Sequence, residues 1–361
     1  MALPLPGNWR PQPPLAEPLP LPPQPIPQRR LPILPLLLFV TTLATTTFAG
    51  AFQRGVDPLV DPGAIVLGLP FALTLMAILL CHEMGHYCFA RFHGVWASLP
   101  YFLPAPPYLF PIGTFGAFIR MKSPPLDRRA LFDVGAAGPW AGVCVAIPAV
   151  VIGLSLSEVR PLSPFEGGVI LGDSLLFSAL THLVLGSEAE RMSIILHPVA
   201  LAGWFGLFVT CLNLLPVGQL DGGHVMYSLF GHGHRWIARA FLVVIFVLGY
   251  QYWFGWFVWL VLLFFLGINH PPTRDVLSSL DVRRKIYAWC TVGLFGLTFM
   301  PVPLRIAEPE PLPGGEVTPI AYQVAQPSLL SNHGSSITLA VAETAGPGRP
   351  RSAGLRFVYR P

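Results

Sequence analysis

The sequence predicts an all-α, multi-pass membrane protein with about seven transmembrane helices and a β-rich re-entrant loop. Of its 361 residues, 53% are apolar and 11% are charged, whereas average soluble chains carry about a quarter charged residues. Mean hydropathy is +0.60. Several apolar runs reach the length that a helix needs to cross a bilayer. Most lysines and arginines then fall on one side of these runs, as expected for loops on the cytoplasmic face.

The first 30 residues contain eleven prolines and no long apolar run. This composition predicts a disordered, proline-rich arm rather than a signal peptide, which needs an apolar centre. Arg29 and Arg30 stand directly before the first predicted span, residues 31–52. We expect a polytopic membrane domain over residues 31–302, with its core at 64–228, and a low-complexity tail over residues 303–361.

The second predicted span, residues 63–92, carries the motif His82-Glu83-Met84-Gly85-His86. On a helix, His82 and His86 lie one turn apart on the same face and can share a metal ion. Glu83 can reach a water molecule held by that metal, as in the H-E-x-x-H pattern of zinc hydrolases. Ionisable residues within a bilayer mark functional sites. The alternative is a pair of histidines that end a membrane helix at headgroup level, and a third ligand would decide between the two interpretations.

Residues 98–122 are apolar but rich in proline and glycine, so they cannot form a continuous transmembrane helix. Side chains alternate over residues 115–120 in a pattern typical of short strands. Non-helical backbone at membrane depth is tolerated where it is buried in protein or lines a wet cavity. We therefore expect a re-entrant loop beside the motif.

The third predicted span, residues 130–156, has a face of small residues suited to close helix packing: Gly135, Ala136, Ala137, Gly138, Ala141 and Gly142. A loop follows over residues 157–197, with an amphipathic stretch at Leu175–Leu185. Further spans are predicted at residues 198–215 and 286–301. The apolar run at 236–267 is long for one span and splits into two short helices hinged at 250–254. With this split, of the basic residues in the loops only Arg54, Arg160 and Arg191 lie opposite the N-terminal arginines.

The segment that follows the fourth predicted span, residues 198–215, offers a third metal ligand. Pro216 breaks the helix, and Gly218 and Gly222 let the backbone turn. Asp221 follows this break and is the best-placed carboxylate for a catalytic zinc site, which takes three protein ligands and an open position. Asp221 can also be read as a turn residue at the membrane surface. Asn213 either caps the backbone or binds a substrate carbonyl near the metal.

The other histidines and the cysteines are interpreted as structural. His232 and His234 lie between spans and are expected to be solvated, while His93, His182, His197, His224 and His270 sit near predicted helix ends. The five cysteines, Cys81, Cys88, Cys144, Cys211 and Cys290, fall in apolar segments and predict buried free thiols. Thiolate ligation by Cys81 or Cys88 is conceivable, but the motif already supplies two ligands.

Two of these segments together resemble the signatures of the site-2 protease family of intramembrane zinc metalloproteases (peptidase family M50). They are His82-Glu83-Met84-Gly85-His86 and Asn213-Leu214-Leu215-Pro216-Val217-Gly218-Gln219-Leu220-Asp221-Gly222. Residues 113–122 resemble the subgroup that includes the plant chloroplast EGY proteases and their bacterial relatives. The loop at 157–197 is too short for the PDZ domain that many members carry between these signatures.

The resemblance implies one Zn²⁺ per chain, bound by His82, His86 and Asp221, with Glu83 as general base and Asn213 holding the scissile carbonyl. It implies a membrane-protein substrate with a transmembrane helix, a lipid bilayer as environment and no nucleic-acid partner. The bacterial cytoplasmic membrane is expected, with the N-terminus cytosolic and an organellar membrane as the alternative. Competing hypotheses are a transporter or channel with a broken helix, and a zinc-binding scaffold without catalysis.

Overall fold

The computed structural model describes residues 32–123, 125–161, 168–187, 192–275, 278–307 and 357–359. The chain divides into two units, Met1–Ile33 and Leu34–Pro361, and the second contains every feature discussed below. The predicted proline-rich arm, residues 1–30, lies outside the described residues. So does most of the predicted tail.

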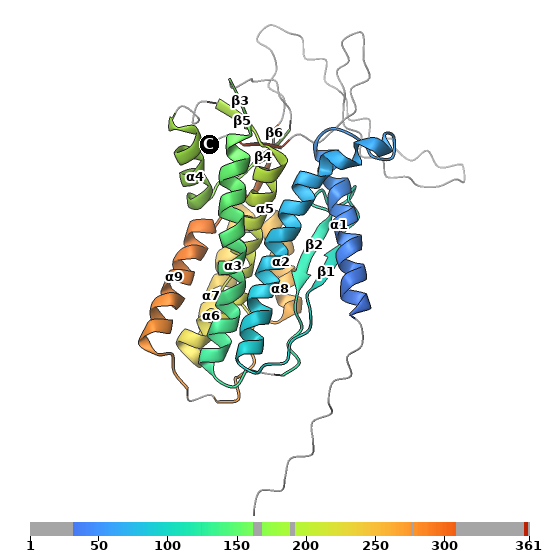
Figure 1. Ribbon diagram of the computed structural model, residues 1–361. Helices are drawn as coiled ribbons and strands as arrows, with labels where there is room; N and C mark the ends of the chain where they lie inside the picture. Colours follow the sequence, from blue (N-terminus) through green and yellow to red (C-terminus); the bar gives the residue numbers. More distant parts are fainter. Residues whose placement is uncertain are drawn as a thin grey trace, which may run out of the picture. The chain divides into compact units, whose positions relative to one another are not determined.

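The second unit is dominated by helices (Figure 1). Their bounds are α1 (Ile33–Gln53), α2 (Leu69–Phe92), α3 (Arg128–Ser155), α4 (Leu175–Leu185), α5 (Pro198–Asn213), α6 (Asp221–Phe230), α7 (His234–Gln251), α8 (Gly255–Leu266) and α9 (Val282–Thr298). Short 3₁₀ turns, η1 (Pro62–Gly68) and η3 (Gly231–Gly233), precede α2 and α7. Both predicted interruptions are confirmed, because α5 ends at Asn213 before Pro216, and α7 gives way to α8 within residues 250–254.

Four segments of the described chain are long and apolar enough to cross a membrane: Ile33–Gln53, Pro62–Phe92, Arg128–Ser155 and Asp221–Gln251. α4, α5 and α8 are apolar but shorter. A helix of 16 residues such as α5 rises about 24 Å, less than the roughly 30 Å of a hydrocarbon core. The fold class of a mostly helical membrane protein is therefore confirmed, with four candidate spans rather than seven by this criterion.

The predicted strands of the proline- and glycine-rich segment form a hairpin. β1 (Tyr101–Pro104) pairs antiparallel with β2 (Thr114–Phe118), with Tyr101 opposite Phe118. The turn is held by α1, because the Thr45 hydroxyl donates a 2.7 Å hydrogen bond to the carbonyl of Gly113. Gly113 has φ +75° and a Cβ there would lie 2.4 Å from the Thr45 carbonyl oxygen, so both conformation and space demand glycine.

A second sheet has the strand order β3-β5-β7-β4-β6. Its strands are β3 (Glu158–Pro161), β4 (Gly168–Leu171), β5 (Met192–Ile195), β6 (Leu304–Ala307) and β7 (Phe357–Tyr359). Two of these strands come from the predicted low-complexity tail. Trp204 on α5 joins this sheet region to the helices by donating a 2.9 Å hydrogen bond to the Gly172 carbonyl.

The helix α3 lies at the centre of the packing and contacts α2, α5, α6 and α9 (Figure 1). Asp127 caps its N-terminus, because the Asp127 carboxylate accepts a 2.8 Å hydrogen bond from the Ala130 N–H. The main core is apolar and includes Phe71 of α2 and Phe205 of α5, whose rings pack edge to face. Long helices around one small-residue helix thus enclose the region where the motif lies.

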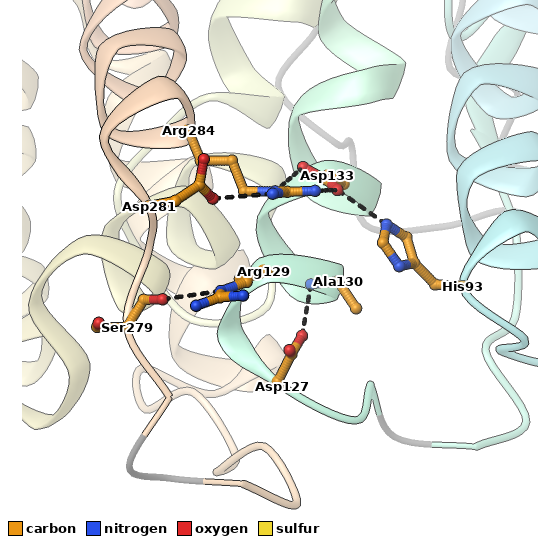
Figure 2. Close-up of polar contacts among 8 residues, drawn as sticks. All are labelled: His93, Asp127, Arg129, Ala130, Asp133, Ser279, Asp281 and Arg284. Carbon is orange, nitrogen blue, oxygen red and sulfur yellow. Dashed lines mark hydrogen bonds and ion pairs between the residues drawn. The ribbon is translucent and has the colours of Figure 1, made fainter.

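An ionic cluster ties three helices together beside this core (Figure 2). Arg284 of α9 donates to both carboxylate oxygens of Asp133 on α3, at 2.8 and 2.7 Å. Arg284 also donates to Asp281 at 2.8 Å. His93, the C-terminal cap of α2, lies 2.8 Å from the same Asp133 through its Nε2. The bidentate geometry fixes α9 against α3 more firmly than a single charge pair would.

The prediction of five buried thiols is partly wrong. All five cysteines are free, but only Cys211 is buried in the protein, whereas Cys81 is half-buried and Cys88, Cys144 and Cys290 are exposed. The error has a physical reason. Apolar segments of a membrane-spanning helix face lipid as well as protein, so an apolar neighbourhood in the sequence does not place a side chain in the protein interior.

Candidate metal centre

His82 and His86 lie in the second half of α2 and both are buried. Their spacing of four residues puts the rings one turn apart, with ring centroids 4.8 Å from each other. The two Nε2 atoms approach to 3.1 Å. The motif helix thus presents two imidazole nitrogens to one point in space.

Asp221 reaches the same point from a distant part of the chain. It is the first residue of α6, and its Oδ2 lies 3.2 Å from His82 Nε2 and 3.3 Å from His86 Nε2. The preceding turn uses Gly218, which has φ +58°. Gly222 does not act in this turn as the sequence suggested. It lies inside α6, where a Cβ would come within 2.0 Å of the Leu214 carbonyl oxygen, so its role is close packing.

These three side chains fit a metal ion by the chemistry of their facing atoms. His86 Nδ1 lies 2.7 Å from the Val134 carbonyl, which can only accept, so Nδ1 carries the proton and Nε2 of the neutral ring presents a lone pair. That lone pair faces a carboxylate oxygen and a second imidazole nitrogen. Ligands at Zn–N and Zn–O distances of about 2.1 Å in a tetrahedron stand about 3.4 Å apart. The three observed separations of 3.1, 3.2 and 3.3 Å lie slightly below that edge.

The small-residue face of α3 lies directly against the two histidines. A Cβ on Gly138 would come within 2.1 Å of His86 Nε2, and one on Gly142 within 3.2 Å of His82 Nδ1. Gly85, inside the motif, packs against the backbone of α3, where a Cβ on Gly85 would lie 2.6 Å from the Ala137 carbonyl oxygen. The predicted close packing is therefore present, and it bears on the metal centre itself.

A cavity of about 380 Å³ opens onto these atoms, and Glu83 lines it. The Glu83 side chain is buried, 5% exposed, and its carboxyl interacts with the backbone of Ile119. Ala117 to Met121, which end the hairpin and continue beyond it, form one wall of the cavity. A carboxyl group, three atoms that could bind a metal ion and an extended backbone segment thus share one cavity.

Asn213 is the last residue of α5 and also lines the cavity. Its side-chain nitrogen lies 3.2 Å from His82 Nε2. All five residues predicted from the sequence as site residues are therefore close to one another. Cys88, considered as an alternative ligand, is exposed and is not among the residues that line this cavity.

From the sequence, His224 was placed near a helix end and considered as a ligand only in place of Asp221, and His234 was misjudged. His224 is buried, lines the metal cavity, and lies 2.6 Å from His270 through Nδ1 and Nε2. A signal existed, since His224 stands three residues after Asp221 and shares its helix face. His234 was expected to be solvated but is 1% exposed, whereas His232 is exposed as expected.

The chain is similar to a known protein family and to several named proteins. The profile of peptidase family M50 matches residues 70–255. The chain is 33% identical over 254 residues to a protein of Oryza sativa subsp. japonica named probable zinc metalloprotease EGY1, chloroplastic, covering 66% of this chain and 42% of that protein. It is 30% identical over 307 residues to EGY1 of Arabidopsis thaliana, which covers 76% of this chain and 54% of that protein. It is 34% identical over 223 residues to EGY2 of Arabidopsis thaliana, which covers 61% of this chain and 39% of that protein.

The chain therefore spans about half the length, or less, of these curated relatives. All three are named probable zinc metalloproteases of the chloroplast. No solved structure matches the chain.

Proposed function

Because the chain belongs to peptidase family M50, we propose that it is an intramembrane zinc metalloprotease. Its substrates would be membrane proteins, cut in or near a transmembrane helix. The observation that carries this proposal is the convergence of His82 Nε2, His86 Nε2 and Asp221 Oδ2 beside the carboxyl group of Glu83 in one cavity. The relatives' names, which describe zinc metalloproteases, support the same chemistry.

We assign the metal-binding role to His82, His86 and Asp221, whose ligand atoms all lie within 4.8 Å of one another. Zinc held there would supply a water of pKa about 7 and polarise a peptide carbonyl. Glu83 would act as the general base, taking a proton from that water and delivering it to the leaving amide nitrogen. The side-chain amide of Asn213 would donate to the carbonyl oxygen as negative charge develops on it.

A helical substrate must unwind before its peptide bond can be attacked, because its own hydrogen bonds protect the backbone. The cavity offers an extended partner, since residues 117–121 form its wall and β2 pairs with β1 along one edge. We propose that the unwound substrate segment adds to this hairpin as a further strand, which would bring its backbone to the metal centre.

For the membrane arrangement, we propose seven spans, with α5 and α8 crossing beside longer neighbours and the hairpin re-entrant. The asymmetric distribution of basic residues supports a cytosolic N-terminus and an orientation in which α2 ends on the cytosolic side. We propose the bacterial cytoplasmic membrane, while the chloroplastic relatives make an organellar membrane the competing location.

The decisive experiment separates metal binding from catalysis. In the full chain, purified in detergent and given a reporter with one transmembrane helix, Glu83→Gln should keep its zinc because all three ligands remain. Its cleavage rate should fall by about 10²–10⁴-fold for want of a base. Cleavage by the variant near the parent rate would show that Glu83 is not the base. Zinc in the parent without any cleavage would indicate a scaffold, and no zinc would indicate a transporter.

A further inference from the structure

A second cavity of about 220 Å³ shares no lining residue with the metal cavity. Its walls come from α6, from the start of α7 and from the segment after α8: Tyr227, Gly231, His232, His234, Arg235, Arg239, Asn269 and His270. His270 stacks on Tyr227, with ring centroids 4.4 Å apart. Through its contact with His224, His270 also joins this cavity to the metal cavity.

His234 lines this cavity and has an unsatisfied polar atom. The residue is 1% exposed, and its Nε2 has no hydrogen-bond partner. The ring bonds to the backbone of Pro216, which offers only a carbonyl, so the other ring nitrogen, Nδ1, must be the donor. Nε2 of the neutral ring therefore carries a lone pair that needs a donor. Buried polar atoms are rarely left without a partner, because the lost hydrogen bond to water is not replaced.

Positive charge gathers at the same wall. Arg235 and Arg239 lie one turn apart at the start of α7, both are exposed, and neither has an ion-pair or hydrogen-bond partner among the described side chains. Both guanidinium groups lie over the ring of Trp236, at 5.7 and 4.9 Å from its centroid. The positive end of the 18-residue helix α7 adds to their field. An anion is the ligand that this arrangement would stabilise.

We propose that the second cavity binds a phosphate group that carries a hydroxyl. The phosphate oxygens would pair with Arg235 and Arg239, and the hydroxyl would donate to His234 Nε2. A glycerol-phosphate headgroup of a membrane phospholipid and free monohydrogen phosphate both have this chemistry. Trp236 is 62% exposed where an apolar helix begins, the place that tryptophan takes at a membrane surface and where basic pockets meet anionic headgroups.

Native mass spectrometry of the full chain in neutral detergent tests the proposal without any cleavage assay. The probe is an equimolar mixture of phosphatidylglycerol and phosphatidylcholine. The parent should retain phosphatidylglycerol preferentially, and the double variant Arg235→Gln/Arg239→Gln should lose about 30-fold in apparent affinity, for two charges near the surface. The matched control is Arg283→Gln/Lys285→Gln, which removes two exposed charges from the start of α9 and should bind as the parent does.

A second arm adds inorganic phosphate to the loaded parent. Displacement of the lipid would show that the phosphate group alone is the ligand, and retention would show that the site takes the lipid headgroup. Equal retention of phosphatidylglycerol by the test and control variants would overturn the proposal. So would equal retention of both lipids by the parent, because binding would then depend on neither the headgroup hydroxyl nor the net negative charge. Zinc content and melting temperature, measured on each protein, confirm that the variants are folded.

Discussion

Gly138→Ala should disable the metal centre although no ligand is changed. The added Cβ would lie 2.1 Å from His86 Nε2, whereas ordinary contacts begin at 3.4 Å, so the ring or the helix must move by 3.4 − 2.1 = 1.3 Å. The His86 ring cannot swing away without losing its hydrogen bond to Val134. Misplacement of a catalytic geometry by 1 Å can cost about 100-fold in rate, and we expect a loss of at least that size together with weakened zinc binding.

Helix propensity alone predicts that Gly138→Ala stabilises the protein, since alanine favours a helix by up to about 1 kcal/mol over glycine. Gly296→Ala in α9 is the matched control, because nothing lies within 4 Å of its built Cβ. Zinc per chain, measured by elemental analysis after gel filtration, and cleavage of a transmembrane reporter should both be normal in the control and reduced in Gly138→Ala. Parent-like zinc content and rate in Gly138→Ala would refute the proposed position of α3 against His86.

Three further outcomes are expected. Asp221→Ala should lose zinc and activity while Asp173→Ala, outside the metal cavity, keeps both; retained zinc in Asp221→Ala would assign the third ligand elsewhere. Arg284→Gln should lower stability by about 1–2 kcal/mol because Asp133 loses two hydrogen bonds and keeps, among the described residues, only its contact with His93, seen as a lower melting temperature than that of the exposed neighbour variant Lys285→Gln. In a chain without native cysteines, an impermeant thiol reagent should label Lys122→Cys from the cytosolic side and Glu158→Cys from the other, and labelling of both from one side would contradict the topology.

Features encoded by neighbouring residues could be predicted from the sequence. The α2 helix, the break at Pro216 and the short helix Leu175–Leu185 depend on local hydrophobicity and on the missing N–H of proline. The β1–β2 hairpin follows from alternation that a helix cannot satisfy. The candidate site could also be predicted from the sequence. Its two histidines are four residues apart, and its carboxylate follows the helix break at Pro216.

Features that depend on distant partners could not be predicted. His234 stands in a Gly-His-Gly-His segment that looks like a polar loop, yet it is buried because its ring bonds to Pro216 in the loop before α6. Strands β6 and β7 pair with β4 and β5 across long stretches of chain. The same limit applies to the exposed cysteines, since the sequence does not tell which face of a helix meets lipid and which meets protein.

The proposed metal centre depends on backbone features that would hold each ligand before any ion binds. Imidazole lone pairs and a carboxylate repel one another when no proton or metal ion lies between them, so the fold must hold them together. The Val134 carbonyl orients His86 through Nδ1, and the absence of a side chain on Gly138 leaves room for that ring. Asp221 stands in the first turn of α6, where the helix dipole favours a negative charge. A metal ion bound between the three atoms would relieve this repulsion, so the features that hold the atoms together should make metal binding tight. A methyl group on α3 is therefore expected to act on the metal.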